Sequence, residues 1–278
     1  MSFAVVVAFV SMLVLLFMRV PVFVSVMGAS AAYFILTPGI TSRILVQRMI
    51  AGSENVALLA IVFFVCAGIF MGCSGVTKRL MNFCDILVGG FVGGLGQVSV
   101  LLATLMGGIS GSSYADAAMQ SKMIVPEMVK RGFSLEFSSV ITAMAAIITP
   151  LIPPGIALII YGSIANISIG KLFVAGFGPG ILLCILLMIM VSIISHKRNY
   201  KATRTEPITA QAFLSALRRA IPVLILPIVI IGGIRLGVFT PTEAGVVAIM
   251  YSIVLGLYYR ELTWNIFLEG IKETVIAS

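Results

Sequence analysis

One stretch of the chain, residues 101–131, interrupts an apolar run with a glycine- and serine-rich turn and then resumes it. It reads LLATLMGGISGSSYADAAMQSKMIVPEMVKR and ends on Lys130 and Arg131. A backbone that leaves the helix at membrane depth is tolerated only where it is buried in protein or lines a watery site. Polar turns of this kind occur at the substrate and ion sites of transporters. The stretch therefore predicts a re-entrant helical hairpin, over about residues 94–130, with a polar tip inside the membrane.

The composition excludes a soluble protein. Of the 278 residues, 60% are hydrophobic and 10% are charged, whereas a soluble domain carries about 25% charged residues. The formal net charge is +8, but the basic residues lie in short loops between apolar runs, as in other membrane proteins. We therefore predict an all-α polytopic membrane protein, with the lipid bilayer and not nucleic acid as its partner.

Apolar runs of roughly 20 residues are long enough to cross about 30 Å of hydrocarbon as helices. Such spans are expected at residues 2–18, 20–37, 54–74, 171–195, 219–236 and 241–259. Interfacial or amphipathic helices are expected at residues 40–52 and 76–92, a basic soluble loop at residues 196–207, and the start of a further segment at residues 262–278. The chain is thus divided into N-terminal spans and interfacial helices (1–92), a transport domain with the hairpin and a broken helix (93–170), and further spans (171–278).

The placement of basic residues favours the hairpin over a full crossing. If both feet of the hairpin face the cytoplasm, most of the 18 Lys and Arg residues fall on the cytoplasmic side, as the positive-inside rule requires. A full crossing at residues 101–131 would put Lys78 and Arg79 on the opposite side from Lys130 and Arg131. We therefore expect both feet, and the basic loop, to be cytoplasmic.

The hairpin tip carries the first set of candidate site residues. Small residues let the backbone turn sharply and approach other groups closely. Free carbonyls at the end of the first arm suit a cation, and free N–H groups at the start of the second arm suit an anion. The candidate substrate- or sodium-binding residues here are Gly108, Ser110, Gly111, Ser112, Ser113 and Asp116.

Asp116 has two interpretations from the sequence. The spacing Ser113-x-x-Asp116 matches a capping box at the start of the second arm. A carboxylate inside a membrane is also a functional candidate by default. Both alternatives stay open at this stage.

A second set of candidates lies at residues 149–155. Three prolines remove three backbone donors and prevent a regular helix there, so residues 135–169 are expected to form two half-helices around an unwound middle. Exposed carbonyls such as those of Pro150 and Ile152 commonly hold cations in transporters. The candidates are Thr149, Pro150, Ile152, Pro153, Pro154 and Gly155. The alternative is a plain proline kink.

Two further observations bound the function. Thr240, Pro241 and Glu243 predict a capping box that starts a helix. The chain has no Walker A sequence, no Ser/His/Asp set and no metal-ligand set, so we predict that it is not an enzyme and has no cofactor other than a coupling ion.

Taken together, these motifs resemble the large membrane subunit of tripartite ATP-independent periplasmic (TRAP) transporters, the DctM/SiaM type. The similarity runs through nearly the whole chain and includes SGSSYAD in the hairpin, ITPLIPPG in the broken helix and VFTPTEAG before the last span. The resemblance implies an elevator-type ion-transporter architecture, of which this chain has the first half of an inverted repeat.

The resemblance also implies a function. It is that of a permease in the bacterial inner membrane, in which sodium drives uptake of an organic acid such as a C4-dicarboxylate or sialic acid. The implied partners are a small four-helix membrane subunit and a periplasmic substrate-binding protein. The family's motif positions carry over to Ser110, Gly111, Ser112, Asp116, Pro150, Pro153 and Pro154, with sodium expected at Ser110, Ser112 and Pro150.

The chain departs from the family pattern in hydroxyl and acidic groups. Gly68 is followed by Ile69 instead of an acidic residue, Ala145 and Ala146 replace serines, and Gly155 replaces the serine after the paired prolines. These changes predict altered sodium affinity or substrate choice. The second half of the repeat is also missing before Ser278, so we expect an incomplete polypeptide.

Two alternative functions remain at this stage. A truncated, transport-inactive membrane fragment is consistent with the early end of the chain and the lost hydroxyls. A channel would require a continuous polar pore, whereas the polar residues gather at two breaks.

Overall fold

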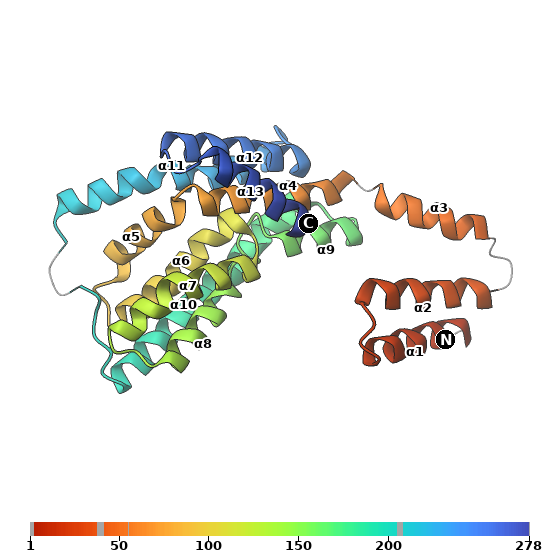
Figure 1. Cartoon of the computed structure of the whole chain (residues 1–278), viewed down its shortest axis with the longest axis horizontal. Helices are drawn as coiled ribbons and strands as arrows, with labels where there is room; N and C mark the ends of the chain where they lie inside the picture. The colour runs from red at the N-terminus through yellow and green to blue at the C-terminus, as the bar shows by residue number, and fades with distance from the viewer. Residues whose placement is uncertain (1–2, 38–41, 55, 205–207, 278) are drawn as a thin grey trace. The chain divides into compact units, whose positions relative to one another are not determined.

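The computed structural model describes residues 3–37, 42–54, 56–204 and 208–277. In these ranges the regular structure is entirely helical, with no strand (Figure 1), and the predicted all-α class is confirmed. The helices are α1 (Phe3–Phe17), α2 (Val22–Leu36), α3 (Ser42–Ser53), α4 (Val56–Cys73), α5 (Val76–Val88), α6 (Gly94–Ser110), α7 (Ser113–Lys130), α8 (Leu135–Ala146), α9 (Ile156–Ala165), α10 (Ile169–Lys197), α11 (Ala210–Arg235), α12 (Pro241–Tyr258) and α13 (Trp264–Ala277).

The chain divides into two compact units, Met1–Asn55 and Val56–Ser278, and each is described by itself. The division into residues 1–92, 93–170 and 171–278 concerns functional parts and stays a prediction.

The first unit is built on an antiparallel pair of apolar helices, α1 and α2 (Figure 1). The chain reverses at Arg19, which has a positive φ of 62°. Pro21 then caps α2, where its missing N–H would have no helical partner in any case. Each helix has 15 residues, fewer than the roughly 20 of a straight crossing, so their assignment as spans stays a prediction. The short helix α3 lies where the interfacial helix was expected.

The second unit is built around the predicted hairpin, whose arms are α6 and α7. Helix α6 is buried along most of its length because α8 and α10 pack against it as well as α7 (Figure 1). Helix α4 packs against α12 and α13 and also contacts α6. The buried apolar side chains of these helices form one continuous core. The first arm of the hairpin thus lies at the centre of the unit, whereas the second arm has an exposed face that begins at Tyr114.

Both feet of the hairpin meet the same loop, which confirms that the stretch turns back. The Thr203 N–H donates to the Gly89 carbonyl at 2.8 Å, just before α6. The Arg131 side chain, at the end of α7, donates to the Thr203 carbonyl at 3.1 Å. A full crossing would separate Gly89 and Arg131 by the thickness of the membrane.

An aromatic contact strengthens the attachment of this loop. The Tyr200 ring lies 4.4 Å from the Phe133 ring, centroid to centroid, and its hydroxyl accepts the Ser134 N–H at 3.1 Å. Hydrogen bonds from Ser134 and Arg198 lower the pKa of the Tyr200 phenol. The described part of the basic loop is therefore anchored to the hairpin, while residues 205–207 of the predicted loop lie outside the described residues.

The predicted broken helix is also present. Helix α8 ends at Ala146 and α9 begins at Ile156, with turns and no regular helix between them. The Pro153–Pro154 peptide bond is cis. The alternative of a plain proline kink is wrong. A kinked helix bends at one point and stays helical on either side of it, whereas residues 147–155 form a whole segment without regular helix.

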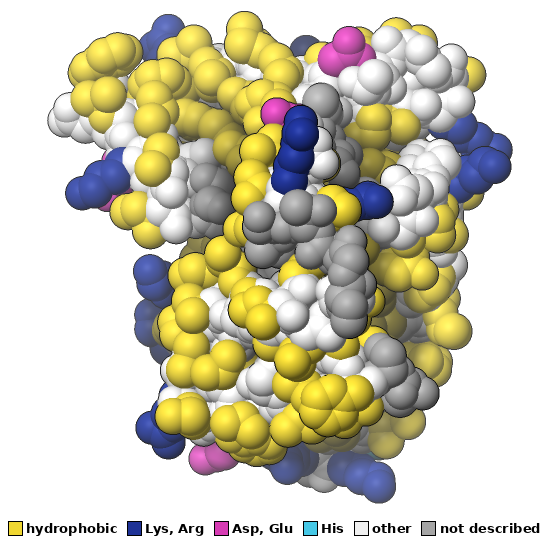
Figure 2. Space-filling view, turned by 90° about the vertical axis from the view of Figure 1, so that its right-hand side faces the viewer, with side chains coloured by type: hydrophobic (Ala, Val, Ile, Leu, Met, Phe, Trp, Pro, Cys, Tyr) yellow, Lys and Arg dark blue, Asp and Glu magenta, His cyan; other side chains and the backbone are white. Residues whose placement is uncertain are grey.

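Long apolar helices complete the second unit. Among the described residues, α10, α11 and α12 are long and apolar enough to cross a membrane, and α4 with α5 form a further pair bent by 72°. Helix α11 starts at Ala210, before the predicted span at residues 219–236. Residues 210–218 and the predicted span form one helix because Ala216, Leu217 and the arginines that follow them are good helix formers. Large apolar side chains on α10, α11 and α12 are exposed, among them Ile185, Ile228 and Met250, as expected for a surface that meets lipid. Hydrophobic side chains, yellow in Figure 2, are likewise frequent at the surface seen there.

The predicted capping box at the start of α12 is confirmed. The Thr240 hydroxyl accepts the Glu243 N–H at 3.3 Å, and the Glu243 carboxylate accepts the Thr240 N–H at 2.7 Å. Pro241 takes the first helical position.

Replacing Thr240 with alanine is expected to reduce the free energy of unfolding by about 1 kcal/mol, because an amide at the start of the helix loses its acceptor. Unfolding of the purified chain in mixed detergent micelles measures this loss. Thr240→Ser keeps the hydroxyl and serves as the control. An equal loss in both variants would contradict a role for the cap.

Candidate functional site

The hairpin tip is formed by two residues between the helices. Gly111 ends α6 in the left-handed conformation, with φ of 59°, which glycine adopts without steric cost. Ser112 then caps α7, and its hydroxyl accepts the Ala115 N–H at 3.4 Å. Of the two interpretations of Asp116, the capping box formed by Ser113 and Asp116 is therefore wrong. The chain turns one residue earlier than the motif suggests, which leaves the Asp116 side chain free to point inward.

Asp116 lies in a buried hydrogen-bond network. Its Oδ2 accepts the Thr149 hydroxyl at 2.8 Å and the Gln120 amide at 3.1 Å. The Ser99 hydroxyl donates to the Gln120 Oε1 at 2.6 Å. None of these four side chains is more than 1% exposed. The network ties α6, α7 and the break of the broken helix together at one point.

One oxygen of this carboxylate is not satisfied. Asp116 Oδ1 is buried and has no hydrogen-bond partner among the described residues. A buried acceptor without a partner costs about 1–3 kcal/mol, and more when it is charged. Such an atom is a natural ligand for a cation.

The tip and the break are in direct contact. The Ile156 N–H donates to the Gly111 carbonyl at 3.4 Å. A Cβ atom on Gly107 would lie 2.8 Å from the Ile152 Cβ, and one on Gly111 would lie 2.5 Å from the Pro154 carbonyl oxygen. The backbones approach this closely only because these positions carry no side chain. The two polar interruptions predicted from the sequence thus lie side by side.

A cavity of about 540 Å³ opens beside the tip. Ser110, Ser112 and Asp116 line it from the hairpin, and Ile156 lines it from the start of α9. Lys122 of α7 also borders the cavity. Its volume lies within the range of small-molecule sites, about 300–1,000 Å³.

The predicted site residues fall into three groups. Three line the cavity: Ser110, Ser112 and Asp116. Six form the contact between tip and break or the packing around it: Gly108, Gly111, Thr149, Ile152, Pro153 and Pro154. The others are Ser113, the half-buried first residue of α7, and Pro150 with Gly155, which face each other.

Of the three predicted sodium ligands, Ser110 and Ser112 lie at the same cavity, whereas Pro150 does not line it. The Ser110 hydroxyl donates to the Met106 carbonyl at 3.3 Å and Ser112 caps α7, while both also border the cavity. Pro150 is not among the lining residues of this cavity, since its carbonyl oxygen lies against Gly155. The oxygen donors nearest the tip are hydroxyls, carbonyls and one carboxylate, which suit a hard cation. The described residues contain no group of three His, Cys, Asp or Glu side chains that would hold a metal.

Sequence reasoning missed Ser99 and Gln120. Gln120 follows Asp116 by four residues, so the two side chains share a helix face, and this spacing was a usable signal. Ser99 had no signal, because its partner lies 21 residues away on the other arm.

Comparisons with known proteins agree on one family. Residues 9–278 match the model of a protein family described as "Tripartite ATP-independent periplasmic transporter, DctM component". The sialic acid TRAP transporter large permease protein SiaM of Vibrio cholerae is 41% identical over 94% of this chain and 61% of its own length. The sialic acid TRAP transporter permease protein SiaT of Haemophilus influenzae is 39% identical over 99% of this chain and 44% of its own length. The C4-dicarboxylate TRAP transporter large permease protein DctM of Pseudomonas aeruginosa is 36% identical, over 90% of this chain and 60% of its own length. The chain thus spans about two to three fifths of the length of these relatives.

Proposed function

The chain belongs to the DctM family of tripartite ATP-independent periplasmic transporters, and from this premise we propose that it acts in sodium-coupled uptake of an organic acid. The family consists of transport permeases and not of enzymes. The chain is a multi-pass protein of the bacterial inner membrane. The substrate, the coupling ion and the partners are the parts that we propose.

The observation that carries the proposal is the unsatisfied Asp116 Oδ1 at the hairpin tip. A bound sodium ion would supply the positive partner that this oxygen lacks. The hydroxyl of Thr149 and the amide of Gln120 already hold Oδ2, so the carboxylate is oriented before the ion arrives. Such a preorganised oxygen loses little freedom on binding.

The proposed substrate is a carboxylate. Relatives described above are named for sialic acid or C4-dicarboxylates, and both are acids. The cavity beside the tip contains the N-terminus of α7 and Lys122, and helix N-termini and ammonium groups both favour anions. Asp116 and Glu273 also line it, so the cavity would favour an anion only after sodium has neutralised Asp116. The substrate carboxylate would lie in this cavity, beside the sodium-binding tip.

The proposed partners are a small four-helix membrane subunit and a periplasmic substrate-binding protein, which would deliver the acid from outside. Transport would follow an elevator mechanism, in which the hairpin and the broken helix carry the site across the membrane together. The direct contact between Gly111 and Ile156 supports motion of these two elements as one body.

Uptake into proteoliposomes tests the proposal. The chain is reconstituted with the small subunit and loaded binding protein, and radiolabelled sialic acid or succinate is supplied with an inward sodium gradient. We expect uptake that a potassium gradient of equal size does not support. Uptake without sodium dependence would contradict the coupling, and no uptake of any acid would support the alternative of a transport-inactive fragment.

A further inference from the structure

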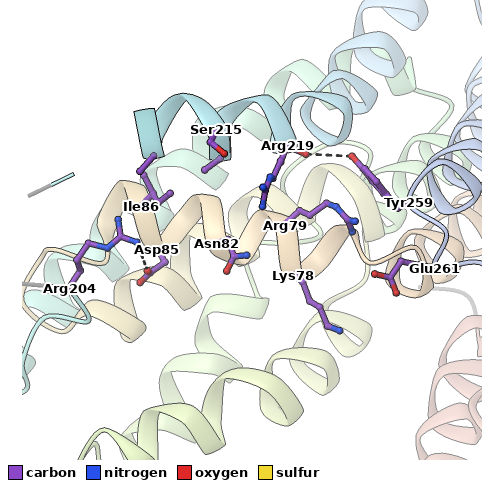
Figure 3. Close-up of a pocket in the computed structure, with 12 residues that line it drawn as sticks. Lys78, Arg79, Asn82, Asp85, Ile86, Arg204, Ser215, Arg219, Tyr259 and Glu261 are labelled. Atoms are coloured by element: carbon purple, nitrogen blue, oxygen red, sulfur yellow. Dashed lines mark hydrogen bonds and ion pairs between the residues drawn. The ribbon is translucent and has the colours of Figure 1, made fainter. Parts of the chain in front are cut away.

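A second cavity, of about 680 Å³, lies where α5, the start of α11 and the end of α12 meet (Figure 3). It lies away from the hairpin tip and shares no lining residue with the cavity described above. Its charged lining residues are four basic and two acidic: Lys78, Arg79, Arg204, Arg219, Asp85 and Glu261. The walls of this basic cavity thus carry an excess of positive charge.

Two of the four cations already have partners inside the protein. Arg204 forms an ion pair with Asp85 at 3.4 Å. Arg79 lies over the Tyr259 ring, 3.6 Å from its centroid, and donates to the Gly75 carbonyl at 2.8 Å. These contacts hold the two guanidinium groups in place at the rim of the basic cavity.

The other two cations have no such partner. Neither the Lys78 ammonium nor the Arg219 guanidinium has a hydrogen bond or ion pair with any described residue. Figure 3 shows Arg219 pointing from α11 toward α5, where Arg79 lies. Like charges gathered in one cavity repel each other, so the arrangement favours an anion that enters from outside.

An apolar surface continues from this basic cavity along α11. A neighbouring hollow of about 560 Å³ shares Ser215, Arg219 and Tyr259 with it and is also lined by Leu214. An exposed stripe then follows one face of the helix, at spacings of seven, four and three residues: Leu214, Ile221, Ile225 and Ile228. Residues at these spacings lie on the same helix face. The site therefore offers cations at one end and an apolar track at the other.

Lys78 points to the other side of α5, away from Arg219 (Figure 3). The geometry points to a binding site for an anionic phospholipid, and we propose that Arg79 and Arg219 contact the phosphate of its headgroup. The acyl chains would lie along the stripe that starts at Leu214. Free phosphate would use the cations but leave this stripe uncovered, and for that reason the site is assigned to a lipid. The charge bias of the chain places this end at the cytoplasmic leaflet, where basic pockets between helices bind lipid headgroups.

Native mass spectrometry of the purified full chain in detergent tests this assignment. Phosphatidylglycerol is titrated against wild type and the double variant R79Q/R219Q, with phosphatidylcholine and inorganic phosphate as separate arms. Each Lys or Arg near an anionic lipid contributes about a fivefold change in affinity, so we expect roughly thirtyfold weaker binding in the double variant. Phosphatidylcholine and inorganic phosphate should bind wild type much more weakly than phosphatidylglycerol.

A matched control removes the same charge elsewhere. K130Q/K197Q changes two exposed residues outside the basic cavity and should bind phosphatidylglycerol as wild type does. Leu214→Asn should weaken lipid binding severalfold without changing the affinity for inorganic phosphate. Circular dichroism confirms that each variant is folded.

Three outcomes would overturn the proposal. They are unchanged lipid binding in R79Q/R219Q, an equal loss in K130Q/K197Q, and binding of inorganic phosphate as tight as that of phosphatidylglycerol. The last result would assign the basic cavity to a soluble phosphate compound.

Discussion

Replacing Asp116 with asparagine is expected to abolish the stabilisation of this chain by sodium. The variant keeps the shape of the side chain but removes the charge at Oδ1, which has no partner among the described residues. A ligand at a hundred times its dissociation constant stabilises the folded state by about 2.7 kcal/mol, so the difference between wild type and variant should be of this order. Unfolding in detergent, in NaCl and in KCl at equal ionic strength, measures it.

Without sodium, the difference in unfolding free energy between wild type and D116N should vanish or change sign. A buried charge that lacks a partner destabilises the protein, so D116N should be at least as stable as wild type in KCl. This reversal separates loss of ion binding from general damage to the fold.

Asp85→Asn provides the control for this experiment. Asp85 also has a buried Oδ1 without a hydrogen-bond partner in the described residues, but it lies in the basic cavity and pairs with Arg204. We expect D85N to keep the full response to sodium. Loss of the response in D85N, or its retention in D116N, would contradict a sodium site at the hairpin tip.

Replacing Gly111 with alanine should cost about 2–5 kcal/mol of unfolding free energy. The residue has a φ of 59°, which costs an L-residue about 1–2 kcal/mol. A Cβ atom there would also lie 2.5 Å from the Pro154 carbonyl oxygen, and overpacking of this kind costs about 1–3 kcal/mol more. The tip and the break would have to separate, so sodium-dependent uptake should fall along with stability.

Gly132→Ala separates the cost of the positive φ from the cost of the collision between the new Cβ and the Pro154 carbonyl oxygen. Gly132 has a φ of 88°, and no atom lies within 4 Å of the position of its Cβ. The backbone cost of an L-residue at Gly132 is no smaller than at Gly111. The φ of Gly111, 59°, lies in the left-handed region that L-residues tolerate, whereas the φ of Gly132, 88°, lies outside it. We nevertheless expect G132A to lose less stability than G111A in the same denaturation experiment, because its Cβ collides with nothing. Since the backbone cost at Gly132 is at least that at Gly111, a smaller loss in G132A can come only from the contact between tip and break, and a larger loss in G132A would contradict the expected size of this contact.

The sequence predicted those features of the fold that depend on local chemistry. The hairpin follows from a glycine- and serine-rich interruption together with the charges at its feet, and the contacts of Thr203 with Gly89 and Arg131 bear this out. The break follows from three prolines that lack N–H groups. The capping box at Thr240 follows from a short motif whose hydrogen bonds lie within one helical turn.

Features that depend on contacts between distant residues were not predictable. The motif at Ser113 and Asp116 resembled a cap, but Thr149, 33 residues away, offers Asp116 a buried partner instead. Ser99 joins the same network from the other arm of the hairpin. Spacing along one helix contains no information about such partners, so the inward orientation of Asp116 became visible only in three dimensions.

The departures from the family pattern have structural counterparts. A Cβ atom on Gly155 would collide with the Pro150 carbonyl oxygen, so this backbone has no room for the serine expected there. Ala145 and Ala146 are buried, and Ile69 lines the cavity beside the tip. The predicted change in sodium affinity or substrate choice stays a prediction, but each lost polar group lies in or near the core that supports the site.

The attachment of the basic loop to both feet of the hairpin has a mechanical consequence. Because Thr203 is hydrogen-bonded to Gly89 and Arg131, the loop cannot stay in place while the base of the hairpin rotates. A spin label on the exposed Lys201 would therefore follow the hairpin through a transport cycle without touching its tip. A change in the distance from that label to a second one on α12 would report movement of the hairpin relative to that helix.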